Sequence, residues 1–470
     1  MFAKPFLSLT LLGLLAVPGW AWPAVAPAAG EGAVTAPDEP FGGAAQLERR
    51  ALLAAVARRN PTLEAARRAW EAAAAKPVQE RSLPDPMLSY GAAPGSIAGS
   101  GLRFGQAIEL SQDLPLPRRR RLRAHQAAAE ARGAAADYRS ALLDLLTSAS
   151  QLYDDDWLVE RSLAIVGQHR ALLAELQRVA AGRYAAGLVP QQDPIQAELE
   201  GAKMLHRQVE LEAERAAIES RLDALLHLPA GHSLPPPALD EPGSPETAAV
   251  QPPADELGTA AAALARRPEV AAHTAEVEAR RAALDLARLA GTPDLALRGS
   301  YNSMWNEPGY RWMVGLGVSL PVRRERLAAQ RQEAEARLAG AQAELAATED
   351  RIRAEVRGAA IAVQEARHLE SIFDSRLLPA ARDQVQAARS GFETGRGAFL
   401  GVIDAERSLR DIELGRERAV ADLHRREAEL DRTLGRLPAG LTAAPLDPAP
   451  PPTAPAPAAQ PERGREGGSR

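Results

Sequence analysis

Two stretches of the chain, about 207 residues apart, carry the same signals in the same order. The spacing between equivalent signals stays between about 206 and 209 residues. Solenoid and propeller repeats are about 20 to 50 residues long, so this repeat instead predicts two pseudo-equivalent halves that build one body. The matched segments are Arg58-Arg59-Asn60-Pro61 with Arg266-Arg267-Pro268-Glu269, Leu83-Pro84-Asp85 with Thr292-Pro293-Asp294, Asp113-Leu114-Pro115-Leu116 with Ser319-Leu320-Pro321-Val322, and Tyr184-Ala185-Ala186-Gly187 with Phe392-Glu393-Thr394-Gly395.

The first residues have the pattern of a secretory signal peptide. Lys4 is followed by an apolar run from Phe6 to Val17 and then by small residues that include Ala21 and Ala26. The run is shorter than the roughly 20 residues of a spanning helix, which disfavours a retained anchor. We therefore expect residues 1–21 to be removed, with the cleavage site left open, and residues 22–43 to be disordered.

Composition and motifs exclude several classes of function. The chain has no cysteine, which rules out disulfides, thiolate metal sites and catalytic thiols. Its net charge of −5 gives no footprint for nucleic acid. His-Glu-x-x-His, Gly-x-Ser-x-Gly and phosphate-loop motifs are absent, and the 8 histidines are scattered. We therefore predict that the protein is not an enzyme and has no cofactor and no metal site.

Long helices are predicted in both halves. Residues 118–189 contain no proline and carry apolar residues at steps of seven, which is typical of coiled coils. Residues 191–228 show a second column with the same period, so the two segments predict an antiparallel hairpin. The second half repeats it at 324–391 and 399–434, with a kink expected at Pro379. Whether these columns pack within one chain or between chains is left open. Their members are Leu145, Leu152, Val159, Val166 and Leu173, then Ile195, Ala202, Val209 and Ala216.

In each half, a predicted pair of strands precedes the helical hairpin. The strands are at 86–92 and 101–112 in the first half and at 294–303 and 309–320 in the second. Apolar and polar residues alternate there with a period of two. Strands about ten residues long with one apolar face favour a transmembrane β-barrel wall over a soluble sheet packed on helices. Four aromatic residues near the second hairpin's tip are expected to form an interfacial girdle: Tyr301, Trp305, Tyr310 and Trp312.

These elements give a domain plan. The two repeats span 44–228 and 254–437, and each begins with a helix before its strands. A Pro-rich connector fills 229–253, and residues 438–470 are expected to be a disordered tail. Four strands cannot close a barrel, and open edges in lipid leave backbone groups unpaired. The chain is therefore expected to oligomerise.

With this arrangement of strands and helices, the sequence resembles the TolC family of outer-membrane efflux channels. The resemblance covers about Leu47 to Leu437 and is most specific at the tips of the helical hairpins, where an aromatic-x-x-Gly unit occurs twice. It implies an α+β membrane protein: a homotrimer with a 12-stranded barrel, continued by a long antiparallel α-helical coiled-coil tunnel in the periplasm. The two tip segments run from Arg183 to Asp193 and from Gly391 to Leu400.

The resemblance also implies a function and partners. Such proteins are passive exit ducts of tripartite efflux systems, held in outer-membrane lipid and joined through a periplasmic adaptor to an inner-membrane pump. Leu83-Pro84-Asp85-Pro86 is similar to the heavy-metal efflux branch. A channel for type I protein secretion is one alternative. A periplasmic adaptor or a structural coiled-coil protein is another, although adaptors carry a single hairpin.

Residue roles follow from the same resemblance. The adaptor-facing positions would be Gly187, Leu188, Val189, Gly395, Arg396 and Gly397, although the glycines could serve only to make the turns. Family members narrow the pore with rings of aspartate near the second tip. Here the matching positions are Gly401 and Asp404, so one acid is missing, and Asp193 stands at the corresponding place in the first tip. Asp404 and Asp193 could equally be solvated surface groups.

Two features concern differences between the halves and their junctions. Arg118 to Arg121 begin the first long helix, and Arg323, Arg324 and Arg326 occupy the equivalent junction. They would lie beside anionic headgroups or form salt bridges with neighbouring helices. Pro379 has no counterpart in the first half, which marks the second hairpin as the expected moving part of a gate.

Overall fold

A computed structural model describes residues 44–93, 105–229, 231–238 and 256–438, together with Phe41. The predicted signal peptide, nearly all of 22–43, residues 101–104 of the second strand, most of the connector and the tail from 439 lie outside the described residues. All elements named below belong to one compact unit, residues 43–470. Among the described helices, none is long and apolar enough to cross a membrane.

Two shorter helices open each half: α1 (Arg49–Arg59) and α2 (Pro61–Arg81), then α5 (Glu256–Arg266) and α6 (Pro268–Leu289). Asn60 separates the first pair, and its side-chain oxygen accepts hydrogen bonds from the backbone N–H groups of Thr62 and Leu63. Pro61 then stands at the first helical position, where no N–H is needed. Arg267 separates the second pair, and its buried guanidinium lies 3.0 Å from carboxylates of Glu269 and Glu355.

Four strands form one antiparallel sheet in the order β1-β2-β3-β4. They are β1 (Met87–Ala93), β2 (Gly105–Leu114), β3 (Leu295–Asn302) and β4 (Trp312–Val318). β3 pairs with β2, so the sheet joins the two halves of the chain. β4 begins three residues later than predicted, because Pro308–Arg311 form a 3-10 turn. Proline has no N–H to give to a ladder, which favours the turn.

One face of the sheet is apolar and uncovered. The register places Tyr90 beside Ile108, Ile108 beside Tyr301 and Tyr301 beside Trp312, so residues of all four strands share this face. Trp312 is 72% exposed and Val314 is 84% exposed. A soluble sheet that buries this face against helices was the alternative, and it is wrong for the described residues. The other exposed members of the face are Leu88, Leu110, Leu295, Leu297, Leu316 and Val318.

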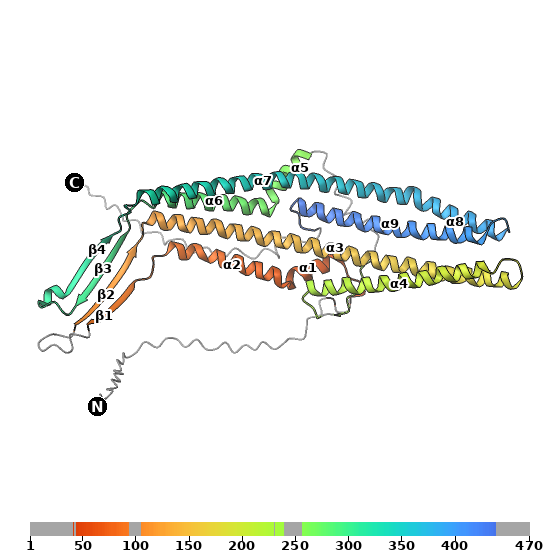
Figure 1. The fold of residues 1–470 in the computed structure, drawn as a ribbon, viewed down its shortest axis with the longest axis horizontal. Coiled ribbons are helices and arrows are strands. Elements are labelled where there is room, and N and C mark those ends of the chain that lie inside the picture. The colour runs from red at the N-terminus through yellow and green to blue at the C-terminus, as the bar shows by residue number, and fades with distance from the viewer. Residues whose placement is uncertain (1–40, 42–43, 94–104, 230, 239–255, 439–470) are drawn as a thin grey trace, which may run out of the picture. The chain divides into compact units, whose positions relative to one another are not determined.

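The long helices run away from the sheet (Figure 1). The first half contributes α3 (Pro117–Ala185) and α4 (Gln192–Leu225). The second half contributes α7 (Arg324–Ile372), a π-helical turn (Phe373–Leu377), α8 (Leu378–Glu393) and α9 (Phe399–Thr433). α3 contacts α2, α4, α6 and α9, whereas α9 contacts α3, α7 and α8. Buried apolar residues lie along these contacts: Ile352, Val356, Val363, Leu423 and Leu430 between α7 and α9, and Trp157 and Val420 between α3 and α9.

The long helix that the sequence predicted at 324–391 is therefore not continuous. The π turn at Phe373–Leu377 interrupts it, and Pro379 stands in the first turn of α8. A proline inside a helix removes one hydrogen bond and clashes with the carbonyl four residues earlier, which a π turn relieves. The ring of Phe373 packs on α9 at Gly415, where an added Cβ would lie 2.8 Å from the ring. The π turn is thus seated against a glycine.

Of the two apolar columns predicted with a seven-residue period, the one in α3 is buried in part and the one in α4 is exposed. Val159, Val166 and Leu173 of α3 are buried as a column should be. In α4 the predicted column is exposed, with Ile195 54% and Val209 57% exposed. The buried seam of α4 lies two positions later: Ala197, Met204, Leu211 and Ile218. Both columns repeat every seven residues, so spacing alone could not say which one faces α3.

Candidate functional site

The two hairpin tips have the same backbone construction. After α3, Gly187 has φ +70° and the N–H of Leu188 donates to the carbonyl of Arg183 at 2.9 Å. After α8, Gly395 has φ +73° and the N–H of Arg396 donates to the carbonyl of Gly391 at 2.9 Å. This is a Schellman-type helix end, which needs a left-handed residue that glycine supplies without strain. The aromatic-x-x-Gly unit is therefore a helix-reversal signal.

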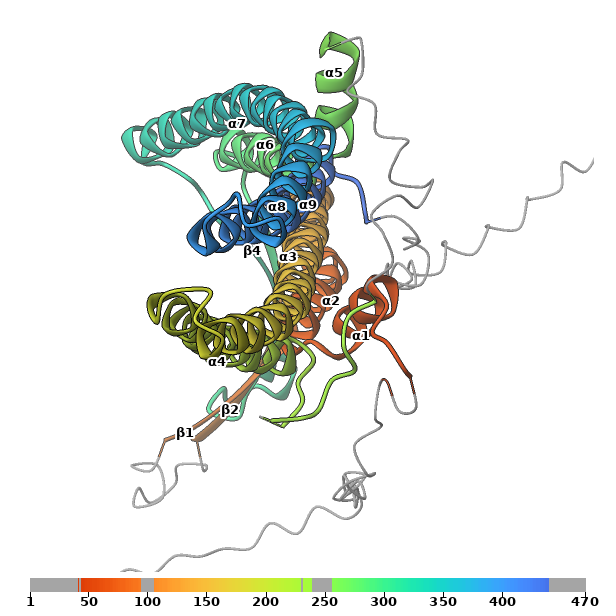
Figure 2. The same cartoon turned by 90° about the vertical axis from the view of Figure 1, so that its right-hand side faces the viewer.

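The two tips lie side by side, at the end of the helices away from the sheet (Figures 1 and 2). Arg183 of the first tip stacks on Phe392 of the second, with its guanidinium carbon 4.4 Å from the ring centroid. One of its N–H groups also donates to the carbonyl of Phe392 at 3.3 Å. Phe392 in turn packs on Phe399, with centroids 5.4 Å apart. An arginine and a buried aromatic pair thus fix one tip against the other.

The six positions predicted to face an adaptor lie at these tips. Five are exposed, and Leu188 is 74% exposed, while Val189 is half-buried. Gly397 has a structural reason of its own, because an added Cβ would lie 3.0 Å from the backbone carbon of Gly391. For Gly397 close packing alone accounts for the residue type. Exposure of the others is what a docking tip requires.

The positions predicted to narrow a pore lie on two helices. Gly401 and Asp404 are on the exposed side of α9, and Asp404 accepts a hydrogen bond from Arg407 at 3.0 Å. Asp193 stands in the first turn of α4, where partial burial raises the pKa of its carboxyl. Both carboxylates are near their tips, but Asp404 is partly neutralised by its arginine.

The best-buried acid near the tips is one that sequence analysis missed. Glu200 of α4 is 2% exposed and forms ion pairs with Arg407 of α9 and, at 2.8 Å, with Lys203. The hydrogen bond from Arg407, followed by that from Lys203, lowers the pKa of Glu200 against the opposing effect of burial. Glu200 therefore carries its charge at neutral pH and ties the first hairpin to the second.

A second buried acid, Glu406, directly precedes Arg407 on α9. Glu406 of α9 is 3% exposed, and Arg389 of α8 donates to its carboxylate at 2.5 Å. Nδ1 of His169, on α3, lies 3.9 Å from Glu406, and Nε2 of His169 lies 2.9 Å from Glu413. These contacts extend the polar link between α3, α8 and α9.

Three consecutive aspartates of α3 face three different neighbours. Asp154 is fully buried between Arg49 of α1 and His424 of α9. Asp155 pairs with Arg425 of α9. Asp156 is 4% exposed, and burial, with the nearby carboxylates of Glu160 and Glu219, raises its pKa to about 7. The run Asp154-Asp155-Asp156 could have been noticed in the sequence, because three adjacent charges cannot all lie on one exposed side of a helix.

At the other end, the aromatic residues predicted for a girdle gather at the tip of the second strand pair. The rings of Tyr301 and Trp312 lie 5.0 Å apart, centroid to centroid. Trp305 is 47% and Tyr310 is 65% exposed, both in the segment between β3 and β4. Their rings lie at the edge of the uncovered apolar face, furthest from the helices.

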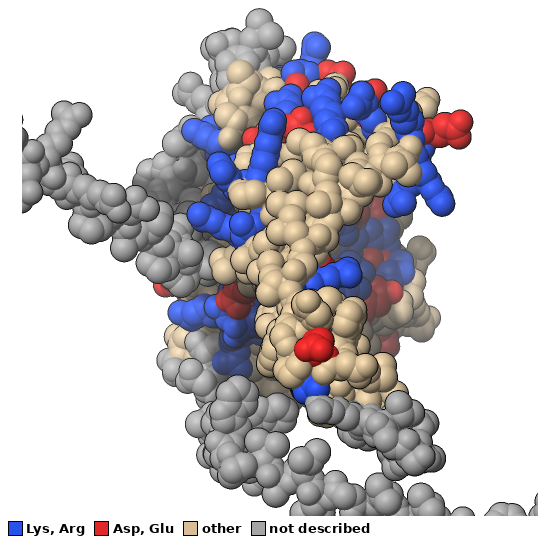
Figure 3. Space-filling model, turned by 90° about the vertical axis from the view of Figure 1, so that its left-hand side faces the viewer, with Lys and Arg blue, Asp and Glu red and all other residues tan. Residues whose placement is uncertain are grey.

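Basic residues lie at the junction of sheet and helices. Figure 3 views the molecule from the sheet end and shows Lys and Arg side chains beside a broad surface of uncharged residues. Arg119 pairs with Asp294 and donates to the carbonyl of Leu289 at 3.0 Å, so the salt-bridge alternative is right for this arginine. Arg323 and Arg326 remain exposed beside a cavity of about 580 Å³.

Residues 260–436 match the family model described as outer membrane efflux protein, which covers most of the second half. The second half of the chain is therefore similar to outer membrane efflux proteins. The first half of the chain repeats the matched half, both in the tip geometry and in the strand pair. No curated protein matches it in sequence.

Solved structures of outer-membrane channels share the fold of this chain. MtrE of Neisseria gonorrhoeae, solved in an open state, is 20% identical with a TM-score of 0.68 over 83% of this chain and 89% of its own. VceC of Vibrio cholerae is 18% identical with a TM-score of 0.67 over 83% and 96%. CusC, whose study concerns folding and transmembrane channel formation, is 18% identical with a TM-score of 0.68 over 83% and 92%.

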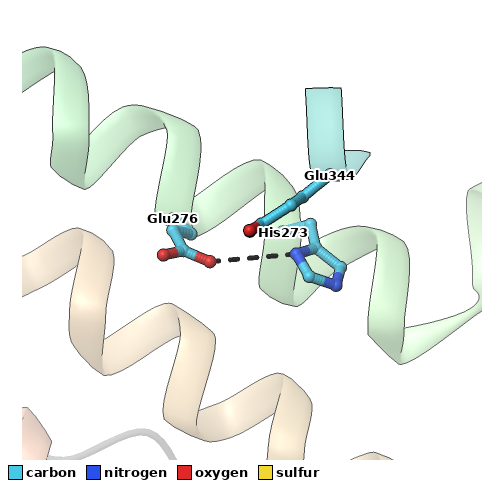
Figure 4. Close-up of side chains that lie close together, drawn as sticks. All are labelled: His273, Glu276 and Glu344. Carbon is cyan, nitrogen blue, oxygen red and sulfur yellow. Dashed lines mark ion pairs between the residues drawn. The ribbon is translucent and has the colours of Figure 1, made fainter. Parts of the chain in front are cut away.

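One group of side chains among the described residues has the donors of a metal site. His273 and Glu276 of α6 and Glu344 of α7 point toward one another (Figure 4), and one ligand atom from each lies within 4.8 Å of the others. Nδ1 of His273 is 3.8 Å from Glu276, whose carboxylate also accepts from Arg280 at 3.1 Å. Because Arg280 already partly neutralises Glu276 and Glu344 is exposed, an ion pair accounts for this geometry.

Proposed function

We propose that three copies of this chain form the outer-membrane exit duct of a tripartite efflux system. The observation that carries the proposal is the uncovered apolar face of the sheet, together with its two outer strands, β1 and β4, which each pair on one side only in the described chain. Exposed apolar strands with free edges are costly in water and also in lipid. Closing four strands from each of three copies into one 12-stranded barrel removes both costs.

The barrel sets the orientation of the rest. Its apolar outer face would lie in the outer membrane, with Tyr301, Trp305, Tyr310 and Trp312 in the lipid interface at the far end. The helices would then extend into the periplasm and surround a tunnel continuous with the barrel. The exposed column of α4 at Ile195, Ala202 and Val209 supports this arrangement, because neighbouring copies would cover it.

The tips are proposed as the docking surface for a periplasmic adaptor, which joins the duct to an inner-membrane pump. Leu188 and Arg396 are presented by equivalent turns, so one chain offers two similar but chemically different contacts, one apolar and one cationic. Gly187, Val189, Gly395 and Gly397 complete this surface. A periplasmic adaptor as the identity of this chain is disfavoured, because the chain carries two helical hairpins and a sheet with an exposed apolar face.

Transport through the duct is proposed to be passive, with a gate at the tips. Three copies of Asp404, with Asp193 and Gly401 nearby, would place negative charge at the narrow mouth and favour cations there. The second hairpin is proposed to move during opening. Its support is the π turn and Pro379, since α3 of the first hairpin is one continuous helix.

The experiment places a charge on one face of one strand. Val314→Arg puts an arginine on the proposed lipid face, which costs about 2–4 kcal/mol at mid-membrane. Met313→Arg, the matched control, puts the same charge on the opposite face of β4, toward the lumen. We expect Val314→Arg to reduce recovery of heat-sensitive trimers from the outer-membrane fraction and Met313→Arg to leave it near wild type. Equal recovery of the two variants, or a wild-type protein found as a soluble monomer, would contradict the proposal.

A further inference from the structure

The contact between the two halves of one chain contains a strand pair and an ion pair. β2 of the first half is antiparallel to β3 of the second, with Gln112 opposite Leu297. Where these strands meet the helices, Arg119, the third residue of α3, pairs with Asp294 just before β3. This contact joins the end of one strand pair to the start of the next.

Because the chain is a repeat, it carries a second copy of each side of this contact. One copy lies at each outer edge of the sheet. β4 ends the second strand pair, as β2 ends the first, and β1 begins the first pair, as β3 begins the second. Arg326 is the third residue of α7, as Arg119 is of α3, and Asp85 matches Asp294. Arg326 and Asp85 are both exposed and make no ion pair within the described chain. Each has the chemistry of a paired residue but lacks its partner.

We infer that the contact between copies repeats the contact between halves: β4 of one chain pairs with the partner subunit's β1, and Arg326 pairs with the partner subunit's Asp85. This rests on the proposed trimer and specifies its interface. The equivalence of Leu114 with Leu320 and of Asp294 with Asp85 fixes the register. Gln112 opposite Leu297 becomes Val318 opposite the partner's Leu88. Three internal and three intermolecular Arg–Asp pairs would then form a ring where the sheet meets the helices.

The register can be checked against the side chains, which were not used to obtain it. A shift by one residue turns a strand's whole apolar set to the other face of a sheet. In the inferred register Val318 faces the partner's Leu88, and Leu316 faces the partner's Tyr90. All four belong to the exposed apolar face of the sheet, with Leu316 67% and Leu88 70% exposed. The apolar face therefore continues across the contact without a break.

The charges agree as well. Among the residues lining the cavity at this junction are four arginines and no carboxylate: Arg119, Arg123, Arg323 and Arg326. Arg119 already has its acid within the chain. A carboxylate from the neighbouring copy would reduce the repulsion among the other three arginines. The equivalence of the two halves places the partner's Asp85 at this position.

The absence of cysteine allows a direct test in the full chain. Directly opposed residues of antiparallel strands have Cα atoms about 4.5–5.5 Å apart, within disulfide range, whereas a two-residue shift moves them about 7 Å along the strand. We expect the double variant Val318→Cys and Leu88→Cys to give covalent trimers on oxidation in the outer membrane. Gln112→Cys with Leu297→Cys, the matched pair inside one chain, should give only internally bridged monomers on a denaturing gel.

The shifted pair Leu316→Cys with Leu88→Cys decides the register. Covalent trimers from the shifted pair but not from Val318→Cys with Leu88→Cys would overturn the inference and leave the proposed duct standing. A wild-type protein that does not trimerise would overturn both. For the ion pair, Arg326→Asp and Asp85→Arg should each lower the temperature at which trimers dissociate, and the double swap should restore it. No recovery in the double swap would remove the Arg326–Asp85 pair from the interface.

Discussion

Glu200 and Arg407 form a buried ion pair between α4 and α9, and they stand 207 residues apart, almost one repeat length. Nearly equivalent positions of the two halves therefore meet face to face near the tips. The stacking of Arg183 on Phe392, 209 residues later, follows the same relation. The duplication thus supplies both the two hairpins and the polar contacts that hold them together.

Removing the arginine of this pair should loosen the two hairpins. Arg407→Ala leaves the Glu200 carboxylate buried with only Lys203 as its cation. Uncompensated buried charges cost about 3–5 kcal/mol, and Lys203 should reduce this to about 2–3 kcal/mol. We expect a lower unfolding temperature, measured by circular dichroism in detergent, together with a larger resting conductance in planar bilayers.

Asp404 provides the control for this variant, because Arg407 also pairs with it at the surface. Asp404 is 55% exposed, and exposed pairs contribute about 0–1 kcal/mol. Asp404→Asn should leave the unfolding temperature nearly unchanged. The pKa of Glu200 is lowered in the fold, so its stabilisation is present above its ordinary pKa and is lost as pH falls through the lower, folded value. An Arg407→Ala variant that keeps the wild-type acid transition would contradict this role.

Asp156 should act in the opposite direction with pH. Its pKa is raised to about 7 in the fold, so between its ordinary value near 4 and about 7 the folded state holds more protons than the unfolded state. Stability should therefore fall as pH rises across that window and level off above it. Asp156→Asn removes the buried charge, and we expect it to be more stable than wild type at pH 8 by about 1–3 kcal/mol and nearly equal at pH 4.

Asp154, two residues earlier on α3, is the matched control for Asp156. Asp154→Asn removes a fully buried carboxylate that is paired with Arg49 and His424, so it should lower the unfolding temperature at pH 8. Opposite signs for two aspartates only two residues apart on one helix would follow from their different partners alone. If Asp156→Asn also destabilised the protein at pH 8, the neutral form of Asp156 would not be the one that the fold prefers.

Two glycines of the second tip, Gly395 and Gly397, should differ in their response to alanine. Gly395→Ala meets no atom within 4 Å but places a side chain at φ +73°, which costs about 1 kcal/mol. Gly397→Ala has no such φ, yet its Cβ would lie 3.0 Å from the Gly391 backbone, so the tip backbone must shift. We expect Gly397→Ala to reduce adaptor crosslinking in cells more than Gly395→Ala does, at similar protein levels. The reverse order would argue against a packing role for Gly397.

The π turn should depend on the absence of a side chain at position 415. Gly415→Ala puts a methyl group 2.8 Å from the ring of Phe373, and overpacking of this kind costs about 1–3 kcal/mol. We expect a lower unfolding temperature and altered opening of the second hairpin. Phe373→Ala combined with Gly415→Ala should recover part of the loss by providing space. Without such recovery, the contact between Phe373 and Gly415 would not hold the turn in place.

The period of the apolar residues and the order of the helices and strands could be predicted from the sequence. The residues that each side chain contacts could not. The alternation around Val314 and Leu316 predicted one apolar face, and the glycines at 187 and 395 predicted the turns. Ile195 and Ala197 of α4 both begin columns of period seven, so the sequence could not say which column packs within the chain. Pro379 predicted a break, but the π turn also needs Gly415, 42 residues beyond Phe373. Glu200 looks like any helical acid until Arg407 is placed opposite it.

The most direct test of the account is the conductance of the purified protein in planar lipid bilayers, with wild type compared to Arg407→Ala. Three chains around one continuous tunnel predict discrete conductance steps for both, larger in Arg407→Ala because the link between its hairpins is weakened. Trimers that insert but show no conductance steps in either protein would contradict the claim that this chain forms a duct.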